Sequence, residues 1–328
     1  MFQIGPYIIS KPTILAPMAG ITDLPFRKIC KNLGAGLVVS EMTAANPDTW
    51  NSKKTKNRIK FQIEEYPRSV QIAGFCPKMM ADAAIHNVQL GAQIIDINMG
   101  CPAKKVCKRA AGSALLKEPE LVNKILVSVV DAVEVPVTLK IRTGWDKTTI
   151  NAIQIAKIAE DAGISALAIH GRTRACRFVG EVEYDTVARV ADSISIPVFA
   201  NGDIDSPKKA KDVIEKTGAT AVMIGRGAFG KPWIFDQINE YLSNGTLNRQ
   251  PSKEEIQKIV MTHLKSIHKF YGESTGLKFA RKHMNWYLGN FNDGKPFSKF
   301  FNSLKTTYDQ IVQMETFLSE GSVILKAA

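Results

Sequence analysis

The loop 98–105 holds a cysteine whose surroundings favour chemical reactivity. It reads Asn-Met-Gly-Cys-Pro-Ala-Lys-Lys, so Cys101 follows a short apolar run and stands between glycine and proline. An unperturbed thiol has a pKa of about 8.5 and is mostly protonated near neutral pH, which lets it act as a general acid. We favour this role. A nucleophile, which needs a nearby base, and an inert buried thiol are the two alternatives.

A lysine interrupts one apolar run in the middle of the chain. Lys140 lies within 137–141, and a buried lysine is rare unless it is paired. One interpretation pairs it with Glu41 or Asp96. The other places its charge beside a flavin ring, where negative charge develops when the ring is reduced.

Two further polar side chains end apolar runs. The Gln71 amide can both donate to and accept from the pyrimidine edge of a flavin, and His170 lies beside a Gly-Arg pair. A lone histidine is more often structural. The segment 16–20, Ala-Pro-Met-Ala-Gly, would present backbone and a methionine to a ring, although in isolation it is only a turn.

Two glycine-containing turns follow the last apolar runs of this pattern. They read Asn201-Gly202-Asp203 and Gly225-Arg226-Gly227. Backbone N–H groups exposed at such turns bind phosphate, and Arg226 can add a charge-assisted contact. The alternative is that the glycines only make tight turns. Two such turns in succession favour phosphate binding.

Basic residues gather in three segments that follow apolar runs. They are Lys53, Lys54, Lys56, Arg58 and Lys60; Lys104, Lys105, Lys108 and Arg109; and Arg172, Arg174 and Arg177. A charge run is usually only a solvated surface. Three runs around one opening indicate a polyanionic substrate that is bound through its phosphates.

The elements that must position these residues are short apolar runs that alternate with amphipathic helical stretches. The runs are 13–16, 37–40, 69–72, 94–97, 137–141, 166–169, 198–200 and 221–224. They lack strict alternation, as is typical of parallel strands that are buried on both faces. Eight such units predict an α/β fold, the (β/α)8 TIM barrel, with an open doubly wound sheet as the alternative. The polar residues at the ends of the runs favour the barrel, because its active site lies at the carboxyl ends of the strands.

The pattern changes near the end of the chain. Residues 253–271, 277–288 and 297–318 read as helices without glycine-closed strands between them. We therefore expect a catalytic barrel over residues 1–241 and an all-helical second domain over residues 242–328.

Composition narrows the kinds of partner and compartment. The formal net charge is +12, from 43 basic and 31 acidic residues, which favours nucleic acid as a partner. A basic proteome background is the alternative. We expect no signal peptide and no membrane-spanning segment, because the start of the sequence lacks a basic flank before a long apolar run and the apolar runs are short. The five cysteines lack CxxC pairs, so we expect reduced thiols, a cytoplasmic protein and no metal site.

Several segments, read in order, resemble one known family. They are APMAGITDLPFR, SEM, VQIAG, IIDINMGCPAKKV, VTLKIRTGW, IHGRTR, ANGDI, MIGRGAFGKPWIF and ARKHMNWYL. Together they are similar to bacterial tRNA-dihydrouridine synthases, and most similar to the B subfamily. The resemblance covers nearly the whole chain. It implies a barrel that holds FMN, NADPH as the reductant, tRNA as the substrate and a helical tRNA-binding domain.

The resemblance also implies residue roles. The cofactor residues would be Pro17, Met18, Ala19, Gln71, Lys140, His170, Asn201, Gly202, Asp203, Gly225 and Arg226. Cys101 would give the proton to C5 of uridine, and Asn98 would hold the target base. The remaining tRNA contacts are expected at Arg172, Arg174, Lys278, Arg281 and Lys282. The B subfamily further implies position 17 of the D-loop.

Two rival functions remain open at this point. A dihydroorotate dehydrogenase-like flavin barrel explains the cofactor site but leaves the basic rim and the helical domain unused. A non-catalytic RNA-binding protein has no use for Gln71, Cys101 and Lys140 together. We expect a monomer with no obligate protein partner.

Overall fold

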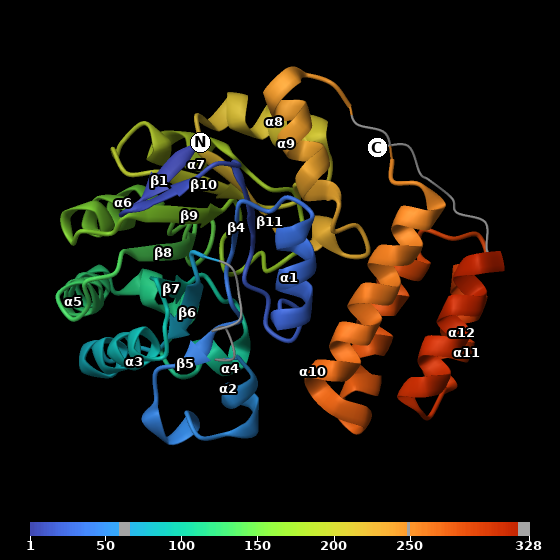
Figure 1. Ribbon diagram of the computed structural model, residues 1–328. Helices are drawn as coiled ribbons and strands as arrows, with labels where there is room; N and C mark the ends of the chain where they lie inside the picture. Colours follow the sequence, from blue (N-terminus) through green and yellow to red (C-terminus); the bar gives the residue numbers. More distant parts are fainter. Residues whose placement is uncertain (59–65, 248–249, 321–328) are drawn as a thin grey trace.

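A curled sheet of parallel strands forms the centre of the computed structural model, which describes residues 1–58, 66–247 and 250–320 (Figure 1). The strand order is β4-β3-β11-β10-β9-β8-β7-β6-β5. The strands are β3 (Thr13–Leu15), β4 (Leu37–Val38), β5 (Thr43–Ala44), β6 (Ser69–Ala73), β7 (Ile94–Met99), β8 (Val137–Arg142), β9 (Ala166–His170), β10 (Val198–Asn201) and β11 (Ala221–Ile224). Each of the eight expected runs therefore contains a strand.

The sheet closes on itself through the interrupted second strand. β4 pairs with β3 and β5 pairs with β6, and these two short strands follow one another in the chain. Between them Val39 bridges to Ser69 in parallel, and the Ser40 backbone N–H donates to the Ser69 carbonyl at 3.0 Å. The prediction of a (β/α)8 barrel is confirmed, and the open doubly wound sheet is wrong.

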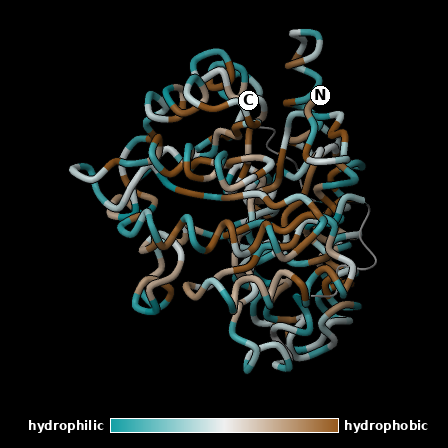
Figure 2. The backbone as a smooth tube through the Cα atoms, turned by 90° about the vertical axis from the view of Figure 1, so that its left-hand side faces the viewer, coloured by the Kyte–Doolittle hydropathy of each residue, from teal (hydrophilic) through white to brown (hydrophobic). Residues whose placement is uncertain are grey.

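Helices cover the outside of the sheet. They are α1 (Leu24–Asn32), α2 (Lys53–Arg58), α3 (Pro77–Gln89), α4 (Lys104–Cys107), α5 (Pro119–Val130), α6 (Ala152–Asp161), α7 (Asp185–Ala191), α8 (Pro207–Thr217) and α9 (Ile234–Asn244), with short 3-10 turns at Pro47–Thr49, Gly112–Lys117 and Arg226–Ala228. Hydrophobic stretches run through the interior of the chain trace, and hydrophilic stretches lie mostly at its edges (Figure 2). Burial of this apolar surface is the main force that closes the barrel.

A small antiparallel hairpin precedes the barrel and was not predicted. It joins β1 (Phe2–Ile4) to β2 (Tyr7–Ile9). Its Phe2, Ile4 and Ile9 side chains are buried with residues of the barrel strands, and the Phe2 and Phe199 rings lie 5.0 Å apart. The hairpin therefore covers the amino-terminal end of the barrel.

The C-terminal helices stand beside the barrel and have a hydrophobic core of their own (Figure 1). They are α10 (Lys253–Leu288), α11 (Gly294–Ser303) and α12 (Thr307–Glu320). α10 is broken at Gly272, whose φ of 74° and ψ of −174° are not helical. Its two segments, 253–271 and 273–288, fold back on one another. This reversal brings the His263 ring of the first segment within hydrogen-bond distance of the Tyr287 hydroxyl of the second. In the described residues no helix is long and apolar enough to cross a membrane.

One helical prediction is wrong in detail. The expected helix over 297–318 is two helices, because the chain leaves α11 at Leu304, where ψ is 139°. The predicted breaks near Tyr271 and Leu288 agree with the structure.

Candidate active site

A cavity of about 610 Å³ lies at the carboxyl ends of the barrel strands. That volume falls in the range of sites for small molecules and cofactors. The predicted cofactor residues all line it: Pro17, Met18, Ala19, Gln71, Lys140, His170, Asn201, Gly202, Asp203, Gly225 and Arg226. Asn98 and Cys101 line it too. With Met42 of the second unit, the structure thus brings together residues from all eight strand units, as is typical of a barrel active site.

A chain of hydrogen bonds runs from the barrel interior to the cysteine loop. The Asp96 carboxylate accepts from Nε2 of the Gln71 side chain at 2.7 Å, and Oε1 of the same side chain accepts from Nδ2 of Asn98 at 2.8 Å. The Asn98 carbonyl oxygen then accepts from the backbone N–H of Cys101 at 3.0 Å. Since both ends of the Asn98 side-chain amide are hydrogen-bonded, its orientation in the cavity is fixed. The bond from Asn98 to the Cys101 backbone also fixes the start of the Cys101 loop.

The Cys101 thiol is partly buried and keeps its proton. Burial raises its pKa above the ordinary value, while a hydrogen bond from the Ala103 backbone N–H and the charges of Arg142 and Lys140 lower it less. Among the described residues no carboxylate or imidazole hydrogen-bonds its sulfur, so a base that would make it a nucleophile is not in place. Arg142, at the end of β8, holds the loop in place by donating to the Gly100 carbonyl at 2.9 Å.

Lys140 is paired with an amide rather than with a carboxylate. Its Nζ donates to Oδ1 of Asn201 at 2.8 Å, so neither Glu41 nor Asp96 is its hydrogen-bond partner. Burial lowers the pKa of Lys140 to about 8, with Arg142 adding to the effect and Asp96 opposing it. A lysine that is only partly neutralised at the cavity wall leaves positive charge for a bound group.

His170 has one ring nitrogen without a partner. Its Nε2 is buried and makes no hydrogen bond to any described residue. Burial, together with Lys140, Arg142, Arg172 and Arg226, lowers the pKa of His170 to about 2, so the ring is neutral. A buried polar atom on a cavity wall with no protein partner is the mark of a ligand contact.

Asp203 holds two arginines beside the turn that follows β10. It accepts from Arg172 and from Arg226, each at 2.5 Å. Gly202 precedes it with a φ of 132°, which only glycine adopts readily, and a side chain there would meet Val182 and His170. Two guanidinium groups against one carboxylate leave a net positive charge beside this turn.

Arg172 lies beneath the rim rather than on it, which corrects its expected position. The residue is 3% exposed, and its guanidinium group donates hydrogen bonds to the Asp203 carboxylate and to the Gly180 carbonyl. Arg174 stacks on the Trp145 ring at 4.3 Å, outside the cavity lining. Arg177 does reach the lining, together with Phe178, which is 55% exposed.

The three helical-domain residues all lie on the second segment of α10. Lys278 is exposed. Arg281 donates to the Leu304 carbonyl at 3.0 Å, and Lys282 donates to the Gly20 carbonyl at 2.6 Å. Two of these three cations therefore have structural partners. Of the basic run after the second strand, Lys60 and the side chains of Lys53 and Lys54 lie outside the described residues.

Sequence reasoning did not predict the roles that three residues have in building the site. Asp96 anchors the hydrogen-bond chain, and Arg142 anchors the cysteine loop. Glu41 accepts from the Gly20 backbone N–H and pairs with Arg58 at 3.1 Å, which fixes the segment 16–20. A charged residue inside an otherwise apolar strand was the available signal for the first two.

This barrel, with polar side chains converging on a cavity at the carboxyl ends of its strands, has the architecture of a (β/α)8 enzyme. A sequence model of the dihydrouridine synthase family, described as Dihydrouridine synthase (Dus), matches residues 14–322. The chain belongs to this family.

Curated relatives agree along nearly the whole length. The chain is 56% identical over 319 residues to tRNA-dihydrouridine synthase B of Pseudomonas syringae pv. tomato, which covers 97% of this chain and 95% of that one. It is 54% identical over 315 residues to the protein of the same name from Vibrio vulnificus, covering 96% and 98%. The Salmonella typhimurium protein of that name is 52% identical over 315 residues.

A solved structure supports the fold alone. The structure of histamine dehydrogenase from Rhizobium sp. 4-9 matches with a TM-score of 0.55 and 11% identity. The match covers 80% of this chain and 50% of that chain, so this chain corresponds to about half of the larger one.

Proposed function

We propose that this chain reduces uridine in the D-loop of tRNA to 5,6-dihydrouridine, with FMN as the bound cofactor and NADPH as the reductant. The observation that carries the proposal is the meeting of Gln71, Lys140, His170 and Asn201 with Cys101 in one cavity. Membership of the dihydrouridine synthase family and the names of its relatives support the same activity.

The residues of the cavity fit a flavin nucleotide. The unpartnered Nε2 of His170 and the ammonium of Lys140 offer contacts to the polar edge of a ring. Gly202, Gly225 and Arg226 offer backbone and charge to a phosphate. When bound and reduced, FMN supplies a hydride to C6 of the pyrimidine.

The protein's own groups then hold the base and move one proton. A uridine that has left its stack enters the mouth of the barrel, as base-modifying enzymes require. Asn98, held by Gln71, hydrogen-bonds the polar edge of the base. Cys101 protonates C5 from its thiol, whose raised pKa keeps the proton in place until the carbon gains electron density.

The tRNA is bound mainly through its phosphates. Lys104, Lys105 and Arg177 are exposed at or beside the cavity mouth, and Lys278 is exposed on the helical domain. We assign the barrel to residues 1–241 and the tRNA-binding helices to residues 242–328, with position 17 as the target and the cytoplasm as the compartment.

The test is a single-turnover experiment on flavin-loaded protein. Gently purified protein should be yellow and release FMN, and the NADPH-reduced enzyme should be reoxidised by unmodified tRNA with formation of dihydrouridine. Reoxidation by free orotate instead would favour the dihydroorotate dehydrogenase-like rival. Colourless protein that cannot be reconstituted with FMN would contradict the proposal.

A further inference from the structure

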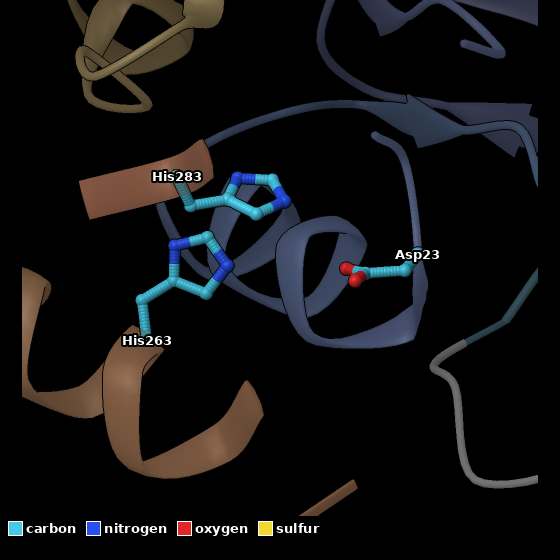
Figure 3. Close-up of side chains that lie close together, drawn as sticks. All are labelled: Asp23, His263 and His283. Atoms are coloured by element: carbon cyan, nitrogen blue, oxygen red, sulfur yellow. The ribbon is translucent and has the colours of Figure 1, made fainter. Parts of the chain in front are cut away.

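Three buried polar groups meet where the helical domain packs against the barrel, and none of them lines the candidate active site. Asp23 is the N-cap of α1, and His263 and His283 lie on the two segments of α10 (Figure 3). Their exposed fractions are 2%, 0% and 1%. Their ligand atoms all lie within 4.8 Å of one another.

Each of these side chains leaves one polar atom without a partner. Oδ2 of Asp23 and the Nε2 atoms of His263 and His283 are buried and have no partner at ordinary hydrogen-bond geometry among the described residues, while Tyr271 also interacts with the Asp23 carboxylate. The opposite atoms of Asp23 and His263 are engaged: Oδ1 of Asp23 accepts from the Phe26 backbone N–H at 3.0 Å, and Nδ1 of His263 lies 3.0 Å from the Tyr287 hydroxyl. Orphaned buried polar atoms are rare, and three that converge on one point call for an occupant.

We propose that Asp23, His263 and His283 bind a divalent transition-metal ion of the zinc type, which fastens the helical domain to the barrel. Two imidazole nitrogens and one carboxylate oxygen form a donor set that zinc uses in proteins. With three ligands from the protein, a trapped water molecule supplies the fourth position. Because the site is closed to solvent, the ion has a structural role and touches no substrate.

The hydrogen bonds around the cluster are compatible with metal binding. If Nδ1 of His263 donates to Tyr287, its Nε2 carries a lone pair, as a ligand histidine with an outer partner does. A single proton on Asp23 can satisfy only one of the two imidazoles. One water molecule can serve all three groups only if one imidazole carries its proton on Nε2 and donates it to the water oxygen, so a measurement of bound metal separates the two occupants.

Aromatic packing holds the ligands in place. The Phe26 ring stacks on His263 with centroids 5.5 Å apart and tilts against His283 at 5.1 Å. Phe26 belongs to α1, so the same helix supplies a ligand and the apolar wall behind the other two. Locked rings and the exclusion of water are what a preorganised metal site needs.

The ion would join three segments that are far apart in the sequence. Its ligands come from the start of α1 and from both sides of the reversal at Gly272. It would therefore fix the angle between the two segments of α10 as well as their position on the barrel. The sequence prediction of no metal site considered cysteine spacing and had no means of finding this cluster.

The first test measures metal in the wild-type chain. Full-length protein carrying no polyhistidine tag, purified without chelators, should contain close to one zinc per chain by elemental mass spectrometry. Protein stripped with a chelator should take up zinc alone, and its thermal unfolding midpoint should rise as zinc is added. A stripped protein that binds no zinc and shows no shift would overturn the proposal and leave a bridging water molecule in its place.

Variants then locate the ion. Asp23→Asn keeps an N-cap acceptor for Phe26 but removes the charge, and His283→Gln removes one ligand; each should lower zinc affinity more than about 100-fold. The matched control is His268→Gln, a buried histidine of the same helix that pairs with Gln310 at 2.9 Å. This control should keep its zinc. Wild-type zinc content in both Asp23→Asn and His283→Gln would place the metal elsewhere and sink the assignment.

Discussion

Lys140 and Asn201 are joined by a hydrogen bond although their strands are not neighbours. Lys140 lies on β8 and Asn201 on β10, with β9 between them, and Nζ donates to Oδ1 at 2.8 Å. The bond must therefore reach across the inside of the barrel. Asn201 itself is held by its amide, which donates to the Met223 carbonyl on β11 at 2.7 Å. The position of the Lys140 ammonium group therefore depends on contacts that link β8, β10 and β11.

Replacing Lys140 should weaken flavin binding and change its pH dependence. Because burial lowers the pKa of Lys140 to about 8, its charge is present below that pH and is lost above it. FMN affinity of the wild-type apoprotein should fall as the pH rises through about 8, and Lys140→Met should bind weakly at every pH. Equilibrium titration of FMN measures both. The exposed Lys157→Met is the control, and a pH limb that survives in Lys140→Met would assign it to another group.

Removing the Cys101 thiol should slow only the step from reduced cofactor to tRNA. Cys101→Ala should keep FMN, be reduced by NADPH and bind tRNA, since the charged contacts lie elsewhere. Single-turnover reoxidation by unmodified tRNA should slow by roughly 10²–10⁴-fold, the usual contribution of a general acid. Cys107→Ala is the matched control, because its sulfur lies 3.6 Å from the Cys101 carbonyl in the same loop. Wild-type rates in Cys101→Ala would assign the proton to solvent.

Binding of tRNA should depend steeply on salt. Contacts to phosphates release counterions, so the logarithm of affinity should fall with the logarithm of salt concentration with a slope of several units. Lys278→Glu should weaken binding while FMN stays bound. It is a cleaner change than reversal at Arg281 or Lys282, which have structural partners. Lys157→Glu on α6 is the control, and an effect of equal size there would mean that only net charge matters.

Asp96 should make the protein lose stability between about pH 4 and pH 6. Burial raises the pKa of Asp96 from 3.8 to about 6, so the folded state holds a proton that the unfolded state releases in this range. The stabilisation is present below the unfolded pKa and is lost as the pH rises through about 6. Asp96→Asn removes this change, worth about 3 kcal/mol between the limits. Denaturant unfolding at several pH values measures it, and parallel pH curves for both proteins would refute the assignment.

The barrel could be predicted from sequence because its strands are buried on both faces and its turns contain functional groups. Pro17, Gln71, Cys101 and Lys140 reached the same cavity because the end of a parallel strand is a fixed place in this fold. The hairpin β1–β2 was missed, since two three-residue strands carry too little periodicity to detect. The break after Ser303 was missed because the apolar pattern continues through it.

Side-chain contacts between residues that are far apart in the chain could not be predicted from the sequence. The Gly-Arg-Thr-Arg segment predicts a basic rim, yet only the structure shows Arg172 turned inward to Asp203. The same holds for Asp23, His263 and His283, which no local pattern connects. Long-range pairing decides whether a charged side chain faces water or a buried partner, and residue type alone does not reveal it.

The hairpin over the amino-terminal end of the barrel has a kinetic consequence. With Phe2, Ile4 and Ile9 buried against the first residues of the strands, molecules approach the cavity from its carboxyl end. If NADPH is the reductant, as proposed, its nicotinamide ring and the uridine ring must occupy the same mouth in turn, and the oxidised nucleotide must leave before the RNA base enters. Initial rates measured against one substrate at several fixed levels of the other should then give parallel double-reciprocal lines. That pattern is typical of a ping-pong mechanism, in which the two substrates bind alternately at one site.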